Sequence, residues 1–378
     1  MKYIAVTLVV FLSIGWSSAE ISVQDFIDSA LSHVGDKVDA IEKNPVLFQR
    51  IYRFYQKQYP RESSARLFDY DHVKRAQAFR TNLRIVLSHN ANPQSTFKLK
   101  INHMSDWTDE EANGLRAHIA VEPVNTDQRI ESRQVRAVTV PDQFDWTNQT
   151  RIPNAVTPVK DQRRCGSCYA FAMVGALEKT YAQIYGTSGP LSPQQLIDCS
   201  SENGCEGGSF VGTFNYIKQN GNRLNLEKDY PSTSDGKKQE KCQNTSGQLL
   251  SFNSTLTLQY RQLPTENEQY MKEILYGQGP IYVYYNAGKR EGNDSIFHQA
   301  SIKFDHYASG VYDVPGCPTN ENLNHALVVV GYGTENGVDF WKVKNSWGAA
   351  WGDAGYIKIK RNANMCGIAT HPYYTGLF

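Results

Sequence analysis

The chain has 378 residues, more than one ordinary domain requires, and its formal charge is nearly balanced at +1, with a pI of about 7.6. It has neither the basic excess that predicts nucleic-acid binding nor the acidic run that predicts a solvating tail. Aromatic residues make up 12% of the chain, which is typical of a packed globular protein rather than a disordered one.

The first nineteen residues predict a signal peptide that is cut after Ala19. Lys2 gives a short positive start, residues 4–14 form an apolar run too short to span a bilayer, and Ser17 and Ser18 are small residues that suit signal peptidase. A buried N-terminal strand is the alternative. No other apolar stretch is long enough to cross a membrane. We therefore expect a protein of the secretory pathway, either lysosomal or extracellular.

The seven cysteines all lie after residue 160, which predicts a cysteine-free leader followed by a disulfide-stapled domain. Because seven is odd, three bridges would leave one thiol as a candidate reactive group. Four sequons predict surface glycosylation in a secreted chain, and they begin at Asn148, Asn244, Asn253 and Asn293.

Within the leader, residues 71–90 predict an amphipathic helix, because they lack Gly and Pro and repeat apolar residues at helical spacing. The apolar positions are Val73, Ala76, Phe79, Leu83 and Val86. The alternation that starts at Phe97 then predicts an edge strand, and Thr108 with Glu111 predicts a helix capping box. Residues 122–141 are polar and irregular, with arginines at 129, 133 and 136, and predict an exposed linker that a protease could cut.

The second part begins with helices and ends with strands. Residues 167–186 predict a helix with an apolar stripe and Gly186 as its C-cap, and Ser192 and Pro193 predict the start of another helix. After Tyr276, short strands are predicted between glycine-rich turns, over residues 280–285, 325–334, 340–348 and 355–361. This order predicts an α+β domain with two halves.

Two cysteines, Cys165 and Cys168, are separated by two residues, a spacing compatible with three kinds of site. A redox pair should follow an apolar strand, and the preceding sequence VKDQRR is not one. A zinc site needs a second ligand pair, and the sequence has no other CxxC. The third interpretation is a structural Cys165 beside a reactive Cys168, since Cys168 starts the predicted helix, where free N–H groups and the helix dipole favour a thiolate.

A reactive thiolate needs a proton partner and a group that orients it. His325 is the best placed histidine, because it lies where a loop enters a predicted buried strand. Asn345 follows twenty residues later, in the aromatic-rich sequence KNSWGAAWG. Taken alone, each of these residues is more simply explained as structural.

Together, these residues carry a family resemblance. Residues 165–169 match the pattern C-G-[SA]-C-[WY] around the nucleophile of papain-type peptidases, with His and Asn further along. Other matching blocks, in order, are LSPQQLIDC, GCEGG, NHALVVVGYG, WKVKNSWGAAWGDAGYIKI and MCGIA. The chain therefore resembles a papain-family cysteine peptidase made as a zymogen, and is most similar to the cathepsin L-like branch.

The resemblance implies a papain-like two-lobed α+β fold, in which a helical lobe and an antiparallel, barrel-like β lobe flank the active-site cleft. It also implies a mainly helical inhibitory prosegment. The expected organisation is a signal peptide over residues 1–19, a propeptide over 20–136 with its inhibitor helix pattern at about 66–115, and a peptidase domain over 137–378. We assign no function to residues 20–65.

The leader resembles the family's prosegment in two motifs. The helix pattern falls on Asp71, Arg75, Phe79, Asn82, Val86 and Asn90, with two mild departures. The strand motif that follows it falls on Lys100, Asn102, Met104 and Asp106, where Lys and Met replace the family's Gly and Phe. By resemblance, this segment runs through the cleft in the reverse direction and blocks it.

The resemblance also assigns catalytic roles. Cys168 is the implied nucleophile, His325 the general base and acid, and Asn345 the residue that orients the imidazole. Trp347 shields that His–Asn hydrogen bond from water, and the side chain of Gln162 donates to the oxyanion.

Substrate-binding positions and disulfides follow from the same resemblance. Gly207 and Gly208 form the strip that pairs with extended substrate. Phe210, Ala326 and His371 line the pocket for the residue two before the scissile bond, which implies an apolar preference. The implied bridges are Cys165–Cys205, Cys199–Cys242 and Cys317–Cys366, which leaves Cys168 free.

The sequence thus predicts a cysteine endopeptidase that acts through an acyl-enzyme, is inhibited by its prosegment and is activated by acid. The expected partners are protein or peptide substrates, the prosegment and cystatin-type inhibitors, with no nucleic acid, membrane span, metal or cofactor, and nothing requires more than a monomer. Tyr169 replaces the family's usual Trp, as in a dipeptidyl peptidase of the family. Three alternatives remain: an exopeptidase, a peptide ligase and a catalytically silent binding protein.

Overall fold

The computed structural model forms two compact units, Met1–Leu67 and Phe68–Phe378, which are described separately. The structure describes residues 21–60, 69–119, 139–148, 152–153, 155–186, 189–233, 238–239, 241–243, 246–250, 256–290, 296–320 and 322–378. The predicted signal peptide, the linker arginines and the sequons at Asn244, Asn253 and Asn293 lie outside these residues. Asn148 is described and is exposed.

The first unit contains three short helices: α1 (Val23–Ala30), α2 (Lys37–Lys43) and α3 (Pro45–Gln58). Each begins after a polar N-cap whose side chain accepts a hydrogen bond from the backbone amide of the third helical residue; the caps are Ser22, Asp36 and Asn44. Apolar side chains from all three helices are buried against one another, which explains why a segment with no assigned function still folds.

The second unit starts with the rest of the leader: α4 (Asp69–Ala91), β1 (Phe97–Leu99) and α5 (Asp109–Asn113). Phe79, Leu83 and Val86 are fully buried, but Val73 is 55% exposed, so the predicted apolar face is wrong at that position. The predicted edge strand is confirmed over only three residues, which pair antiparallel with β7 (Tyr307–Tyr312). The predicted capping box starts α5.

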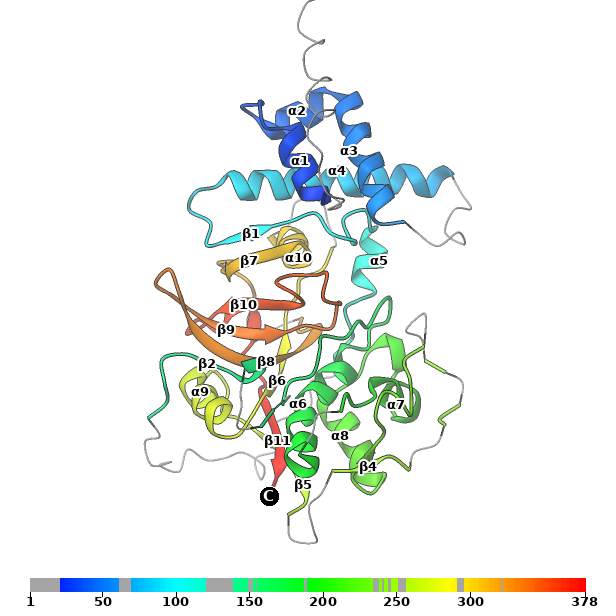
Figure 1. Cartoon of the computed structure of the whole chain (residues 1–378), viewed down its shortest axis with the longest axis vertical. Helices are drawn as coiled ribbons and strands as arrows, with labels where there is room; N and C mark the ends of the chain where they lie inside the picture. Colours follow the sequence, from blue (N-terminus) through cyan, green and yellow to red (C-terminus); the bar gives the residue numbers. More distant parts are fainter. Residues whose placement is uncertain are drawn as a thin grey trace, which may run out of the picture. The chain divides into compact units, whose positions relative to one another are not determined.

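The longer helices of the rest of the unit are α6 (Cys168–Tyr185), α7 (Pro193–Cys199), α8 (Phe210–Gln219), α9 (Glu268–Gly277) and α10 (Ile296–Asp305). Helix α6 ends at Gly186, whose φ of 68° is the left-handed conformation expected of a C-cap. Residues 168–182 of α6 are buried on every side, so the predicted single apolar stripe understates its burial. This helix lies between the sheet and the helices α7 and α8 (Figure 1).

The main sheet is mostly antiparallel, in the order β1-β7-β10-β9-β8-β6-β11-β5, with β2 paired to β8. Among the described strand pairs of this sheet, only β7 and β10 run parallel. The strands not yet given are β2 (Phe144–Asp145), β5 (Leu258–Gln262), β6 (Ile281–Tyr285), β8 (His325–Glu335), β9 (Val338–Lys344), β10 (Tyr356–Lys360) and β11 (Tyr373–Leu377). β3 (Arg223–Leu224) and β4 (Gln248–Leu249) form a separate ribbon. All four predicted strand segments are confirmed.

A buried charge cluster fixes α6 against β9. Glu178 of α6 is 2.5 Å from Lys160 and 3.5 Å from Lys344, and it accepts a hydrogen bond from Thr157. Burial alone would raise the pKa of this carboxyl, but the two lysines and the hydrogen bonds outweigh burial and lower it. The ionised cluster therefore holds in place the end of β9, which continues directly into Asn345.

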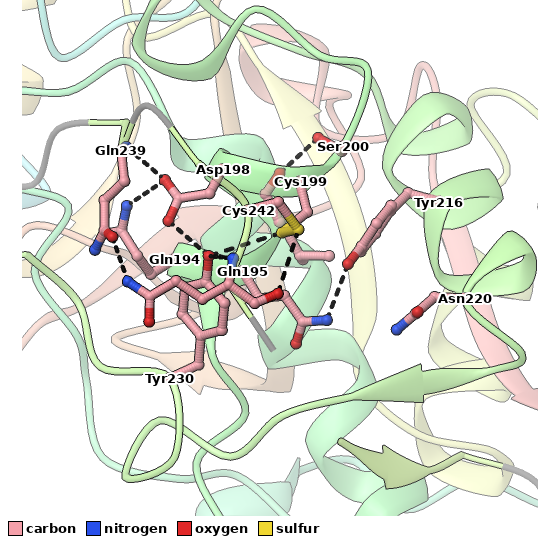
Figure 2. Close-up of a disulfide and its surroundings, with 12 residues drawn as sticks. Gln194, Gln195, Asp198, Cys199, Ser200, Tyr216, Asn220, Tyr230, Gln239 and Cys242 are labelled. Atoms are coloured by element: carbon pink, nitrogen blue, oxygen red, sulfur yellow. Dashed lines mark hydrogen bonds between the residues drawn. A yellow bond between two sulfur atoms is a disulfide. The ribbon is translucent and has the colours of Figure 1, made fainter. Parts of the chain in front are cut away.

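Three disulfides staple the unit: Cys165–Cys205, Cys199–Cys242 and Cys317–Cys366. Figure 2 shows the second of them, which joins the end of α7 to a distant loop. Beside it, Asp198 accepts hydrogen bonds from Tyr230, Gln194 and the amide of Gln239, so the loop is anchored by polar contacts as well as by the covalent bond.

Among the described residues, no helix is both long and apolar enough to span a bilayer.

Candidate active site

A histidine, an asparagine and a tryptophan meet where β8 begins and β9 ends. His325 Nε2 lies 2.8 Å from Asn345 Oδ1, and the Ser346 amide donates to the same oxygen. Because that oxygen accepts, Nε2 carries the proton and the second nitrogen, Nδ1, is left to act as a base; it is buried and makes no hydrogen bond. The Trp347 ring lies 4.9 Å from the imidazole and is itself buried, so water is kept from the His–Asn bond.

Cys168 is the first residue of α6 and the only free cysteine. Its sulfur lies against backbone groups of Ala326, the neighbour of His325, and of Ala117 in the leader. Burial raises the pKa of the Cys168 thiol to about 12, although these backbone groups act in the opposite direction. Burial likewise lowers the pKa of His325 to about 4, against the effect of Asn345. In the full chain, burial therefore favours the neutral form of both groups.

Gln162 is fully buried and held at both ends of its amide. Its Oε1 accepts from Ser346 Oγ at 2.6 Å. Its Nε2 donates to the carbonyls of Cys165 at 2.8 Å and Leu115 at 2.9 Å. A carbonyl oxygen from the leader thus occupies the donor that the sequence assigned to the oxyanion.

The leader crosses this site as one uninterrupted segment of the chain. Leu115 contacts Gln162, the Ala117 amide donates to the Asn324 carbonyl at 2.9 Å, and His118 forms a parallel bridge with Gly207. The His118 amide also donates to the Glu206 carbonyl. The segment from residue 115 to 118 therefore covers the thiol, the Gln162 side chain and the two glycines together.

The lack of a side chain at Gly207 leaves room for the leader, and at Gly208 it leaves room for neighbouring side chains of the protease domain. Gly207 has a φ of 127°, and a Cβ there would lie 2.2 Å from the His118 carbonyl oxygen. A Cβ at Gly208 would lie 2.8 Å from the ring of Tyr169. Tyr169, which replaces the family's Trp, is buried and donates its hydroxyl to the Gly204 carbonyl.

The three predicted pocket residues converge on Tyr284, which the sequence reasoning missed. The Phe210 amide donates to the Tyr284 hydroxyl, Ala326 pairs with Tyr284 in the sheet, and the rings of His371 and Tyr284 are 6.5 Å apart. Phe210 is fully buried and stacks on Tyr373 at 4.1 Å. The position is therefore aromatic and packed in the full chain, with His371 half-buried at its edge.

The leader pattern residues form specific contacts. Arg75 binds Glu111 through two hydrogen bonds of 2.6 and 2.7 Å, and Asn82 donates to the Ser105 carbonyl. Asn90 contacts the backbone of Leu99 as donor and acceptor. Besides Arg75 and Asn82, the buried members are Phe79, Val86, Asn102, Met104 and Asp106. Lys100, where the family has Gly, reaches Gly352 O, so this departure adds a contact. The structure does not describe the side chain of Asp71.

Four further residues were not predicted and belong to the site or to the contact between leader and site: Arg116, Asp305, His306 and Ser346. Ser346 adjoins Asn345, and its place in the KNSWG sequence is a signal that could have found it. Arg116 and Asp305 form a buried ion pair at 2.7 Å although they are 189 residues apart in the sequence, and no local pattern indicates such a pair.

Comparisons with known proteins agree with this arrangement. Residues 140–376 match the papain family cysteine protease model, and residues 48–112 match the cathepsin propeptide inhibitor domain. Cathepsin S of Bos taurus is 36% identical over 329 residues, which cover 85% of this chain and 89% of that protein. Pro-cathepsin H of Medicago truncatula is 33% identical over 383 residues, which cover 97% of each chain.

Solved structures show the same fold. A recombinant stem bromelain precursor superposes with a TM-score of 0.71 at 30% identity, covering 88% of this chain and 99% of its own. Digestive procathepsin L2 from the larval midgut of Tenebrio molitor gives 0.70 at 31% identity, covering 87% and 99%. The predicted two-lobed papain-like fold with a helical propeptide is thus confirmed. The chain belongs to the papain family of cysteine proteases and has the architecture of a zymogen.

Proposed function

We propose that the chain is the zymogen of a cysteine endopeptidase in which Cys168 is the nucleophile and His325 its proton partner. The observation that carries this proposal is the imidazole itself: Asn345 holds Nε2, and the buried Nδ1 has no hydrogen-bond partner at a site where the neighbouring backbone contacts the thiol. Transfer of the thiol proton to Nδ1 gives a thiolate and an imidazolium.

The thiolate attacks the peptide carbonyl carbon, and its oxygen becomes an oxyanion that Gln162 Nε2 and the Cys168 amide stabilise. The imidazolium then gives its proton to the leaving amine as the C–N bond breaks, which leaves a thioester. His325 takes a proton from water, hydroxide attacks the thioester, and the acid product leaves with the thiol restored.

The prosegment blocks this chemistry in two ways. The Leu115 carbonyl occupies the Gln162 donor, and the buried cleft keeps both catalytic groups neutral. Removing the segment admits water, and hydration favours the charged forms of both groups. Because the leader extends past the thiol in both directions, from Leu115 at Gln162 to His118 at the glycine strip, we favour an endopeptidase over an exopeptidase.

The test is hydrolysis of internally quenched peptides at pH 4–5 by the wild type and by Cys168→Ala, with mass spectrometry of the products. We expect internal cleavage by the wild type alone. Cleavage only at a terminus would support the exopeptidase alternative, and joined peptides would support the ligase. A folded, processed wild type that turns over no peptide would support the binding protein and contradict the proposal.

Acid activation has a specific candidate in His306, which follows α10 and is fully buried under the leader. Its Nδ1 donates to the Ile302 carbonyl, and its Nε2 accepts from Ser105 of the leader at 2.9 Å. Burial, with Arg290 second, lowers the pKa of His306 to about 4; Asp305 acts in the opposite direction, and His103 adds to the lowering. The docked leader therefore favours neutral His306.

Because the pKa of His306 is lowered in the docked state, acid weakens the binding of the leader. The contribution of His306 to docking is complete above the ordinary imidazole pKa of about 6.5, and it is lost as the pH falls through about 4. The full effect is at most about 3 kcal/mol. The pKa of Asp305 is held below its ordinary range because Arg116 and Arg290 outweigh burial, so this carboxylate favours the ionised form that binds Arg116.

We therefore expect His306→Gln to flatten the pH dependence of prosegment removal between pH 6.5 and 4. The assay uses a Cys168→Ala zymogen and a trace of mature wild-type enzyme, with each rate divided by that enzyme's activity on a peptide at the same pH. The exposed His33 gives a control, His33→Gln, that should keep the wild-type profile. Equal profiles for all three chains would contradict the role of His306.

We also propose that the protein enters the secretory pathway, for the lysosome or the cell exterior, through residues 1–19. Its prosegment would end near residue 136, and its sequons would carry glycans. These assignments rest on the sequence patterns given above, together with the exposure of Asn148.

A further inference from the structure

The prosegment residue Arg116 is held by a ring of acceptors that belong to the protease domain. Its guanidinium donates to the Ala287 carbonyl at 3.2 Å, to Ser301 Oγ at 2.6 Å and to Asp305 Oδ1 at 2.7 Å. The same group lies over the Trp347 ring, 5.9 Å from its centre. Its only described hydrogen bond within the leader goes to the Ala112 carbonyl. We call Ala287, Ser301, Asp305 and Trp347 the arginine site.

The arginine site lies on the leaving-group side of the proposed nucleophile. His118 pairs with Gly207 of the glycine strip. In the proposed function, this strip and Phe210 bind the part of the substrate that precedes the scissile bond. Ala117 is at the sulfur and Leu115 at the oxyanion donor. Arg116 reaches away from the strip toward Trp347, which packs against His325. A substrate side chain just after the scissile bond would reach the same region.

Asp305 has a second partner that stays in the protease domain after the prosegment leaves. Asp305 is buried, and its Oδ2 is held by Arg290 at 2.7 and 3.1 Å, which leaves Oδ1 for Arg116. Ser301 and Asp305 both lie on α10, so their spacing is fixed by the helix. Arg290 favours the ionised carboxylate through Oδ2 and does not occupy Oδ1, the oxygen that binds Arg116.

The chemistry of the site selects a guanidinium. Three acceptors of the protease domain surround one guanidinium nitrogen, Nη2, and Trp347 offers an aromatic face to the same group. A lysine ammonium offers three N–H groups to the same acceptors, but it lacks the planar face that a guanidinium places over the Trp347 ring. Glutamate has no donor to offer, and it would be repelled by the Asp305 oxygen.

From this geometry, and resting on the proposed function, we propose that the mature enzyme binds a substrate arginine in the arginine site. It thereby cleaves preferentially where arginine is the first or second residue after the scissile bond. Arg116 of the prosegment occupies that subsite in the zymogen. Because the leader crosses the cleft in reverse, it does not define which of the two substrate positions applies, and both are tested.

The experiment measures kcat/KM of the mature wild type on internally quenched peptides that carry Arg, Lys, Gln or Glu at either position. We expect Arg to exceed Gln by roughly tenfold at one position, with Lys between them and Glu lowest. Equal values for Arg and Gln at both positions would overturn the arginine site while leaving the endopeptidase intact. If the wild type cleaved no peptide of the series, the proposed function would fail and the subsite with it.

A variant tests the residues without burying an unpaired charge. Ser301→Ala should lower the Arg-to-Gln ratio of kcat/KM at least threefold, since one acceptor is lost and the Asp305–Arg290 pair is kept. The exposed Ser309 on β7 provides the control, and Ser309→Ala should keep the wild-type ratio. A wild-type ratio in Ser301→Ala would argue against the site.

Discussion

Replacing His325 by alanine in the mature enzyme is expected to lower kcat/KM on a quenched peptide by on the order of 10⁴. In the proposed mechanism, His325 both ionises Cys168 and protonates the leaving amine. No other described histidine forms a hydrogen bond with Asn345. The pH profile should change as well, because the thiol would then titrate near its ordinary pKa of about 8.5. Steady-state kinetics from pH 4 to 9 measure both effects.

The matched control is His298→Ala, which removes another histidine of the protease domain that the mechanism does not use. It should retain wild-type kcat/KM. A His325→Ala enzyme that is folded, as shown by circular dichroism, and within tenfold of wild type would remove His325 from the mechanism.

Replacing Arg116 by alanine in the zymogen should have the second largest effect, a loss of prosegment inhibition at neutral pH. The Arg116 and Asp305 side chains are 3% and 1% exposed, and breaking such a buried pair typically costs about 3–5 kcal/mol. The docked state would therefore be weakened by on the order of 10²–10³. Peptide hydrolysis by the unprocessed chain at pH 7 should rise accordingly, and processing should no longer require acid.

Arg84→Ala is the comparison variant, because Arg84 is an exposed arginine of the same prosegment and its loss changes the net charge equally. It should stay inhibited at pH 7. If the two variants activated at the same rate, the buried Arg116 contact would not be what holds the prosegment in place.

Much of the site was predictable because its signals are local. Cys168 at a helix start, His325 at the entry to a buried strand and Asn345 beside Trp347 each occupy a position that short-range pattern defines. The caps Thr108, Gly186 and Ser192 are local for the same reason, since each satisfies or ends the adjoining turn of helix.

The rest depended on contacts between distant segments. Periodicity placed Val73 on the apolar face of its helix, yet nothing in the described residues covers it and it is exposed. Arg116 and Asp305 are ordinary charges until the fold buries them together. Tyr284 is one of several tyrosines on an apolar strand, and only the pairing of β6 with β8 sets it beside Ala326.

The most direct test of the account is the rate at which iodoacetamide alkylates Cys168, the one cysteine outside a disulfide. The thiol is buried and its pKa is raised in the full chain, so the wild-type zymogen at pH 7 should react at least about a hundredfold more slowly than the mature enzyme. The mature enzyme should already react at its full rate at pH 6, well below the ordinary thiol pKa of about 8.5. Equal rates before and after prosegment removal, or a mature thiol that titrates near 8.5, would contradict it.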